Sequence, residues 1–275
     1  MTTVEATAAE NPVILITGST SGLGREVAIQ LAATGARIIV HGRDAERGQE
    51  VVEEIERQGG SARLYRADLA SLDEVRELAN TILEDYDRLD VLINNAGLGS
   101  APAERLVSAD GHELRFAVNY LSHYLLTRML LPRIIESAPA RIVNVASGAQ
   151  TPIDFDDLML ERDFSGSRAY AQSKLAQILF TVDLAGELEG TSVIVTALHP
   201  ATYMDTGMVR RAGVEPRSSV QEGAEAVINL ATSAEVSSGQ YFNGLRPARA
   251  DSQAYDAHAR AQLRRVSQDL TGVPD

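Results

Sequence analysis

The chain has 275 residues and a formal net charge of −13 at pH 7, and 44% of its residues are hydrophobic. The excess of negative charge argues against a general binder of nucleic acid or of an anionic membrane surface. Cysteine is absent, which excludes disulfides, cysteine-ligated zinc and thiol catalysis and is compatible with a reducing cytoplasm.

The N-terminal residues 1–12, MTTVEATAAENP, are acidic and contain no apolar core. We therefore interpret them as a flexible tail and not as a signal peptide. No later stretch approaches the run of about 18 apolar residues that a membrane span needs. The longest apolar stretch, residues 124–135, is interrupted by two arginines and Pro132. We expect a cytoplasmic protein that does not enter a membrane.

From residue 13 onward, short β-branched runs alternate with helical patterns, without a break in composition or a repeat. Strands are expected at residues 13–17, 37–42, 63–67, 89–94, 141–146, 192–198 and 240–242, and helices at residues 25–34, 45–58, 71–86, 108–136, 169–189 and 219–232. This alternation predicts one α/β domain over residues 13–275, a Rossmann-type doubly wound parallel sheet of about seven strands with helices on both faces. Ligands of such sheets bind at the carboxyl ends of the strands.

A glycine-rich turn, TGSTSGLG, occupies residues 17–24 between the first strand and the first helix. Glycines let the backbone turn tightly and approach a pyrophosphate, while the next helix offers it unpaired N–H groups and a positive dipole end. A turn of this composition could be purely structural. Its position between a strand and a helix favours a dinucleotide site.

The end of the second predicted strand indicates which dinucleotide is bound. An acidic residue there binds the ribose 2′-hydroxyl of NAD, whereas an arginine suits the 2′-phosphate of NADP. Here Gly42 is followed by Arg43, whose planar guanidinium matches phosphate geometry, and Asp44 stands two residues past Gly42. We favour NADP(H) over NAD(H). The alternative is that Arg43 is a solvated loop cation.

The only lysine of the chain, Lys174, stands four residues after Tyr170. On a helix the two side chains share one face. A tyrosine with a pKa near 10 is a poor base at neutral pH, but a nearby cation can shift that pKa by about 1–3 units. Tyr170 could then exchange a proton with a substrate oxygen. A compact ammonium with three separate donors can also touch a ribose hydroxyl, which a guanidinium does less well. Alone, this pair could equally be an exposed helix face.

Two further polar residues join this pair. Ser147 follows the predicted strand at 141–146, at the active edge of the sheet, and its hydroxyl can donate to a carbonyl oxygen. Asn119 stands in the middle of a predicted helix, which is a mildly unfavourable place for asparagine, so a polar role is indicated.

In combination these stretches resemble the short-chain dehydrogenase/reductase superfamily, in its single-domain branch. The matching features follow the expected order: the glycine turn, Asp68-Leu69, Asn94-Asn95-Ala96-Gly97, Asn119, Ser147, Tyr170 with Lys174, and His199-Pro200. The segments DGHELRFAVNYLSHYLLT, IDFDDL and AYAQSKLAQILF are similar to the retinol-dehydrogenase-like group. That group also includes protochlorophyllide reductases, and its members typically use NADP(H).

The resemblance implies a role for each matching residue. Tyr170 is then the general acid/base, Lys174 binds the nicotinamide ribose and lowers the pKa of Tyr170, Ser147 orients the substrate oxygen, and Asn119 holds a water that connects Lys174 to solvent. The implied cofactor contacts, besides Arg43, Tyr170 and Lys174, are Gly18, Ser19, Ser21, Gly22, Leu23 and Gly24 at the pyrophosphate, Asp68 and Leu69 at the adenine, Asn95, Ala96 and Gly97 at the adenosine ribose, and Pro200, Tyr203 and Thr206 near the carboxamide.

The sequence also departs from the family pattern. Pro200 is followed by alanine where the family usually has glycine, and the threonine expected shortly afterwards is displaced towards Thr206, so the residue that meets the carboxamide stays open. Residues 149–168 form an insert that we expect to wall the substrate cleft, and residues 202–221 form a mobile lid. Retinoid enzymes of the family often carry an apolar membrane anchor, which this chain lacks, and this argues against retinol itself as the substrate.

The sequence thus predicts an NADP(H)-dependent oxidoreductase that interconverts a ketone or aldehyde and an alcohol. We expect a soluble ketoreductase for a mid-sized apolar or natural-product substrate. We expect a homodimer or homotetramer formed through the helices at 108–136 and 169–189. The alternatives are an NAD-dependent alcohol dehydrogenase and a catalytically silent NADP(H)-sensing protein, although such sensors usually lack part of the Ser/Tyr/Lys set.

Other enzyme classes lack their motifs. The chain has no G-x-S-x-G elbow, no H-E-x-x-H zinc motif and no P-loop G-K-[ST]. A pyridoxal phosphate enzyme could use Lys174, but the strand–glycine–helix opening fits a dinucleotide better. We expect no metal, and we interpret four of the scattered histidines as structural or surface residues, namely His41, His112, His123 and His258.

Overall fold

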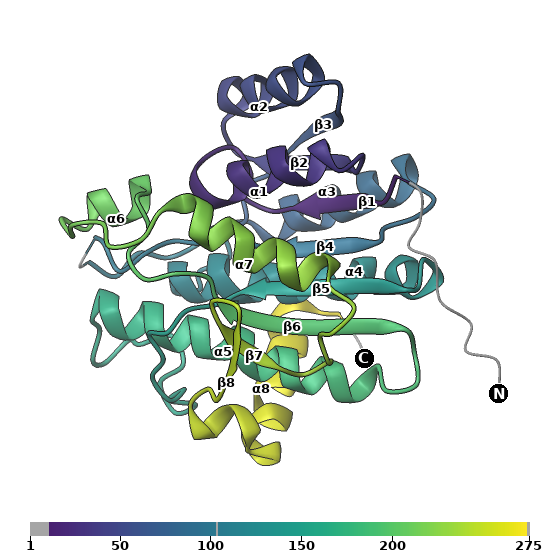
Figure 1. Ribbon diagram of the computed structural model, residues 1–275. Coiled ribbons are helices and arrows are strands. Elements are labelled where there is room, and N and C mark those ends of the chain that lie inside the picture. The colour runs from purple at the N-terminus through teal and green to yellow at the C-terminus, as the bar shows by residue number, and fades with distance from the viewer. Residues whose placement is uncertain (1–10, 103, 274–275) are drawn as a thin grey trace.

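The computed structural model describes residues 11–102 and 104–273, and its eight strands form one sheet (Figure 1). The strands are β1 (Val13–Ile16), β2 (Arg37–Gly42), β3 (Ser61–Arg66), β4 (Val91–Asn94), β5 (Ala140–Val145), β6 (Val193–His199), β7 (Tyr241–Asn243) and β8 (Arg246–Ala248). Their order across the sheet is β3-β2-β1-β4-β5-β6-β7-β8, so the chain reverses its direction of winding beside β1. In sheets of this kind the ligand lies at such a reversal.

All neighbouring strands from β3 to β7 are parallel, which confirms the predicted doubly wound sheet. The sequence did not predict β8, which pairs antiparallel with β7. All three of its residues are exposed, so no buried apolar pattern marked it. Residues 1–10 of the predicted N-terminal tail lie outside the described part of the chain.

Helices cover both faces of the sheet (Figure 1). One face carries α1 (Gly22–Ala33), α2 (Ala45–Arg57) and α7 (Val220–Thr232); the other carries α3 (Leu72–Asp85), η1 (Phe116–Leu121), α4 (Ser122–Glu136), α5 (Gly166–Glu187) and α8 (Ala257–Thr271). The central strand β1 shows why two cores form. Ile14 and Ile16 belong to one apolar cluster and Val13 and Leu15 to the other, because successive side chains of a strand point to opposite faces.

The C-terminal helix α8 was not predicted. It is rich in charge and buries only four spaced side chains, Ala259, Leu263, Ser267 and Thr271. It packs on α5 and is fixed there by the hydrogen bond between Tyr120 Oη and Ser267 Oγ (2.7 Å) and by the ion pair of Arg264 with Asp183 (2.8 Å).

Because α8 and the short helix η2 (Ser252–Tyr255) cover α5, residues 171–181 are all buried. Residues 115–128 of the preceding helix are likewise buried without exception. A helix that is buried on every side needs no second chain to cover it. These middle parts of the two helices that we expected to mediate self-association are therefore covered by the chain itself, whereas Ile135 near the end of α4 is 39% exposed.

Candidate active site

The glycine turn after β1 forms a narrow cradle. Gly18 has a φ of 65°, which a residue with a side chain rarely adopts. A Cβ atom on Gly24 would lie 2.5 Å from both Asn95 Nδ2 and Gly18 O, well inside van der Waals contact. Both positions therefore require glycine.

The N-terminus of α1, like those of η1 and α4, has no side-chain cap, but it alone of these three opens directly after the glycine turn. Its N-cap residue Ser21 makes no side-chain hydrogen bond to the helix. Elsewhere in the described chain a side chain caps each of α2, α3, α5, α6 (Gly207–Arg211), α7 and α8. The N–H groups at the start of α1 are thus not satisfied by a cap, and together with the positive end of the helix dipole they fit a pyrophosphate.

Not every predicted residue of the turn can contact a ligand. Ser19 is fully buried; its hydroxyl donates to Ile16 O and accepts from His41 N, and its N–H donates to His41 O (2.9 Å). All of its donors are used within the protein, so Ser19 supports the turn instead of facing outward. His41 is buried as well, and its Nδ1 accepts from Gly18 N, in agreement with the structural role predicted for it.

The segment after β4 joins the glycine turn to the centre of the site. The hydroxyl of Thr17 accepts hydrogen bonds from the N–H groups of Asn95 (2.9 Å) and Ala96 (3.0 Å). A Cβ on Gly97 would lie 3.3 Å from Asn119 Oδ1 and 3.5 Å from Lys174 Nζ. Residues 95–97 therefore form one wall between the glycine turn and the polar side chains of α5.

Arg43 and Asp68 lie together at the outer edge of the site, after β2 and β3. Arg43 Nη1 is 3.4 Å from Asp68 Oδ2, and the arginine side chain is 66% exposed. Gly42 packs so closely on the glycine turn that a Cβ there would lie 2.5 Å from Thr20 Cγ2. The guanidinium thus stands beside the turn and is free to reorient towards an anion.

Tyr170, Ser147 and Lys174 lie together at the carboxyl end of β5, where sequence reasoning predicted them. A hydrogen bond links Ser147 to Tyr170 and lowers the pKa of the phenol, but burial is the larger effect and raises that pKa above its ordinary value. Lys174 Nζ lies 6.0 Å from the centroid of the Tyr170 ring. Burial lowers the pKa of Lys174 to about 7. The expected lowering of the Tyr170 pKa by Lys174 is thus not the dominant influence here.

Asn119 lies in η1, a π-helical segment and not the regular helix predicted from residue 108. Its side chain bonds both backbone groups of Leu98, with Leu98 N donating to Oδ1 (2.7 Å) and Nδ2 donating to Leu98 O (3.1 Å). Nδ2 also donates to Ser173 Oγ. The carbonyl of Asn119 accepts from His123 Nδ1, 3.0 Å away. Asn119 therefore ties the 95–98 segment to α5, and π-helical turns of this kind often occur at functional sites.

Tyr241 on β7 is a site residue that sequence reasoning missed. Its hydroxyl donates to Ser147 O (3.0 Å), and burial raises its pKa to about 12. It interacts electrostatically with Tyr170, so it belongs to the same cluster. It could have been found only through sheet order, because β7 is the weakest of the predicted strands.

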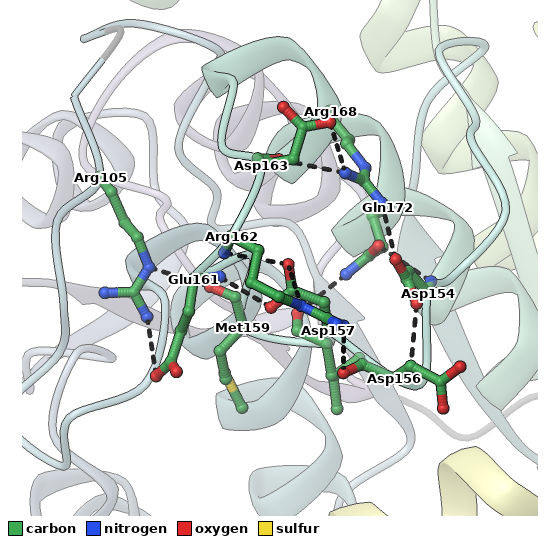
Figure 2. A network of polar contacts seen from close by, with 11 residues as sticks. Arg105, Asp154, Asp156, Asp157, Met159, Glu161, Arg162, Asp163, Arg168 and Gln172 are labelled. Carbon is green, nitrogen blue, oxygen red and sulfur yellow. Dashed lines mark hydrogen bonds and ion pairs between the residues drawn. The ribbon is translucent and has the colours of Figure 1, made fainter.

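The insert at 149–168 is held by a network of ion pairs and hydrogen bonds (Figure 2). Arg168 Nη2 lies 2.9 Å from Asp154 Oδ2, and the buried amide of Gln172 accepts from Asp154 N and donates to Leu158 O. Arg168 and Gln172 stand on α5 on either side of Tyr170 in sequence. The insert is therefore fastened to the same helix that carries the phenol, as a wall beside it should be.

The predicted lid reaches across the site. A Cβ on Gly22 would lie 3.4 Å from Thr206 Cγ2, and one on Gly99 would lie 2.9 Å from Met208 Cγ. The lid thus contacts the glycine turn through Thr206 and the segment after β4 through Met208. Tyr203 is 45% exposed and has a φ of 48°, with its ring 5.4 Å from the Arg217 guanidinium.

A cavity of about 430 Å³ opens where the lid meets the insert. It is lined by Ser100, Ala101, Phe164, Ser165, Gly166, Ser167 and Ala212. Tyr170 and Ser147 do not line it, but Gly166 and Ser167 form the first turn of α5, one turn before Tyr170. Its volume is that of a small-molecule site.

Two negative findings concern the described residues. Among them, no helix has both the length and the apolar character needed to cross a membrane. Within the same residues, no group of three or more His, Cys, Asp or Glu side chains is arranged to hold a metal ion.

Fold and site together define an α/β protein whose glycine cradle lies beside a buried Ser–Tyr–Lys cluster, at the point where the winding of the sheet reverses. The family model described as short chain dehydrogenase matches residues 12–216, so the chain belongs to the short-chain dehydrogenase family. Human retinol dehydrogenase 14 is 38% identical over 94% of this chain and 86% of its own length. Mouse retinol dehydrogenase 13 is 35% identical over 94% of this chain and 84% of its own length.

Solved structures show the same fold. The Pseudomonas aeruginosa RhlG/NADP active-site complex has a TM-score of 0.71 at 27% identity and is covered to 95%, over 86% of this chain. A short chain dehydrogenase of Escherichia coli complexed with NADPH also has a TM-score of 0.71, at 25% identity, with 86% of this chain and 98% of that chain covered. Membership of the family makes the chain an oxidoreductase.

Proposed function

We propose that this oxidoreductase uses NADP(H) to reduce a ketone or an aldehyde to an alcohol. The observation that carries the proposal is the cluster of Ser147, Tyr170 and Lys174 beside an uncapped helix N-terminus and a glycine cradle. The residues fit the cofactor, because the first turn of α1 has no side-chain cap and follows a turn that packing restricts to glycine. The NADP-bound and NADPH-bound relatives support the choice of a nicotinamide dinucleotide.

When bound in this site, a reduced nicotinamide would supply a hydride to the carbonyl carbon. Ser147 donates a hydrogen bond to the carbonyl oxygen and orients it. Because burial raises the pKa of Tyr170, its phenol is protonated at neutral pH, as a proton donor to the developing alkoxide must be. Lys174 stabilises the phenolate that is left, since its ammonium carries a positive charge close to the ring.

The preference for NADP(H) rests on Arg43. Its guanidinium is exposed, lies at the end of β2 beside the glycine turn, and has only a long contact with Asp68. A 2′-phosphate at this edge would gain a charge-assisted hydrogen bond from it. On this proposal Asp68 and Leu69 lie at the adenine, and Pro200, Tyr203 and Thr206 lie on the lid side near the carboxamide.

The proposed substrate is a mid-sized ketone or aldehyde with an apolar body, including a ring-fused natural-product intermediate, as expected from the sequence. The insert, the lid and the segment after β4 leave a cavity of about 430 Å³ whose lining is mostly small and uncharged. Its volume accommodates a mid-sized molecule, but neither Ser147 nor Tyr170 lines it. The name retinol dehydrogenase describes the activity of those relatives, and we do not assign retinol to this protein as its substrate.

We retain a homodimer or homotetramer in the cytoplasm as the proposed state of the protein. Since α8 and η2 cover the middle of α5, we propose that such an assembly uses the parts of α4 and α5 that stay exposed, such as Ile135, or other surfaces.

The alternatives are an NAD-dependent alcohol dehydrogenase and a catalytically silent NADP(H) sensor. Titration with NADPH and with NADH, followed by nicotinamide fluorescence, separates the first of these from the proposal. Turnover of NADPH with a panel of ketones and aldehydes separates the second. Tight NADPH binding with turnover supports the proposal, tight binding without turnover on any panel member supports the sensor, and preferential NADH binding contradicts the role of Arg43.

A further inference from the structure

The ammonium of Lys174 has two acceptors within the protein. It donates to Val145 O (2.7 Å) and to Gln177 Oε1 (2.8 Å), and both bonds are buried. Lys174 is 4% exposed, so water screens its charge little. Val145 lies one residue beyond the last pair of β4 and β5, Asn94 with Asn144, so its carbonyl lies at the end of the ladder. These two oxygens fix the position of the ammonium.

Only one orientation of the Gln177 side-chain amide can form a hydrogen bond with Lys174. Its Oε1 accepts from Lys174, whereas its Nε2 has no hydrogen-bond partner among the described residues. The reversed amide would turn its NH₂ donor towards the ammonium, which has only donors. Gln177 therefore leaves a buried donor unpartnered in order to present an oxygen to Lys174, and an unpartnered buried polar group carries a cost in stability.

A chain of buried polar side chains anchors the turn of α5 that carries Gln177. Thr181 Oγ1 donates to Gln177 O (2.8 Å) and accepts from Asn144 Nδ2 (2.8 Å), and Asn144 Oδ1 accepts from Asn94 Nδ2 (2.8 Å). Asn94 and Asn144 lie on β4 and β5, so this chain ties α5 to the middle of the sheet. The oxygen of Gln177 is thereby held in place relative to Val145.

We propose that Gln177 is a positioning residue, which holds the ammonium of Lys174 against the carbonyl of Val145 and sets the fraction of Lys174 that is charged beside Tyr170. The inference rests on the proposed function, because it concerns the lysine that assists Tyr170. Gln177 acts through Lys174, its hydrogen-bond partner. Gln177 Oε1 is the second acceptor, beside Val145 O, of an ammonium whose charged form burial disfavours.

The titratable groups that face Lys174 are few. Tyr170 stands on the same helix, and its raised pKa leaves it neutral at neutral pH. His123 on α4 also interacts with Lys174, but burial lowers the pKa of His123 to about 3, so it is neutral too. Among the described residues, no carboxylate forms an ion pair with Lys174. The neutral amide of Gln177 is therefore the side chain that most strongly stabilises the charged form of Lys174.

The single lysine makes a direct test possible. With lysine labelled at Cε, the NMR signal of Lys174 is the only lysine resonance of the chain, and its titration gives the pKa without cofactor or substrate. Gln177→Glu places a negative charge on the ammonium and should raise this pKa by at least about one unit. Gln177→Met keeps the length but removes the acceptor, and should lower the pKa by about one unit.

Thr196→Val is the matched control, because Thr196 Oγ1 is also buried and without a hydrogen-bond partner in the described chain but does not touch Lys174. It should leave the titration unchanged. Opposite shifts in Gln177→Glu and Gln177→Met support the proposal. Titrations within about 0.3 units of the wild type in both folded variants would overturn it, since a contacting opposite charge shifts a pKa by more than that.

A second readout links the proposal to catalysis. If the wild type turns over a carbonyl substrate, the pH profile of kcat in Gln177→Glu should move in the direction of the Lys174 shift, while KM for NADPH changes less than about threefold. A moved lysine titration with an unmoved pH profile would overturn the link to Tyr170. Failure of the proposed function would appear instead as absence of NADPH binding and turnover in the wild type, with the NMR result unaffected.

Discussion

Replacing Arg43 with alanine should reduce the preference of the protein for NADPH over NADH. Arg43 follows β2 at the edge of the site, where its guanidinium lies 3.4 Å from Asp68 Oδ2 and is 66% exposed. The 2′-phosphate is the only part of NADPH that NADH lacks. Loss of Arg43 should therefore weaken NADPH binding and leave NADH binding nearly unchanged.

The size of the effect follows from the exposure of the side chain. A hydrogen bond to a charged group contributes about 1.5–3 kcal/mol, and exposure places Arg43 at the lower end of that range. The pair with Asp68 that has to be given up is worth at most about 1 kcal/mol, because both side chains are in contact with water. The net loss is then about 0.5–2 kcal/mol, which corresponds to roughly 2- to 30-fold in the dissociation constant of NADPH.

The assay is fluorescence titration of the wild type and of Arg43→Ala with NADPH and with NADH. Arg47→Ala is the matched control: Arg47 lies four residues later, is 64% exposed and is paired with Asp44, so it removes the same charge from a place away from the glycine turn. An unchanged NADPH affinity in Arg43→Ala, or an equal loss for both dinucleotides, would refute the reasoning.

Three further predictions follow from burial and packing. Gly24→Ala places a Cβ 2.5 Å from Gly18 O, so NADPH affinity should fall at least about tenfold. Gly186→Ala is the control, because a Cβ there meets nothing within 4 Å, and it should leave NADPH affinity unchanged. Equal NADPH affinities of the two variants in a titration would contradict the proposal that the glycine turn holds the cofactor. The pKa of Lys174 is near 7 in the folded protein and has its higher, ordinary value in the unfolded chain. Above about pH 7 the unfolded chain therefore holds a proton on Lys174 that the folded protein has lost, and the free energy of unfolding rises with pH. Lys174→Met should remove up to about 2 kcal/mol of that rise between about pH 7 and about pH 9, and urea titrations with parallel pH profiles would contradict this. Amide exchange in residues 171–181 should not depend on protein concentration, because α8 covers them; protection that grows with concentration would place an interface there.

Much of the fold could be predicted because each buried strand of a parallel sheet is a short apolar run that is visible in the local sequence. β1 and β4 are short apolar runs buried from end to end, and each is followed by polar residues of the site. The elements that were missed carry no such pattern. β8 is the fully exposed segment Arg-Pro-Ala, and only its antiparallel pairing with β7 makes it a strand. α8 buries only four of its side chains, and Leu263 is the only large one among them.

The site divides in the same way. Ser147, Tyr170 and Lys174 could be found because their spacing and their place after a strand reflect the chemistry directly. Tyr241 and Gln177 could not be found, since each acts through a neighbour that only the packed structure identifies. Ser19 was predicted to face the cofactor because it lies in the glycine turn, but the turn rotates it inward onto β2.

The direction of the Tyr170 pKa was the other point at which sequence reasoning was incomplete. A lysine four residues away predicts a lowered pKa, whereas the structure raises it because the phenol is buried. Desolvation depends on everything that surrounds a group and cannot be read from spacing.

The central claim is that Tyr170 transfers a proton at a site that also binds NADP(H). The most direct measurement is a single-turnover experiment in which wild type and Tyr170→Phe, each saturated with NADPH, are mixed with a carbonyl substrate identified from the panel, and the loss of nicotinamide absorbance is followed. Tyr170→Phe should bind NADPH as the wild type does and lose hydride transfer by at least about 100-fold, since general acid catalysis contributes about 10²–10⁴-fold. Hydride transfer at the wild-type rate in Tyr170→Phe, with NADPH bound, would contradict the account.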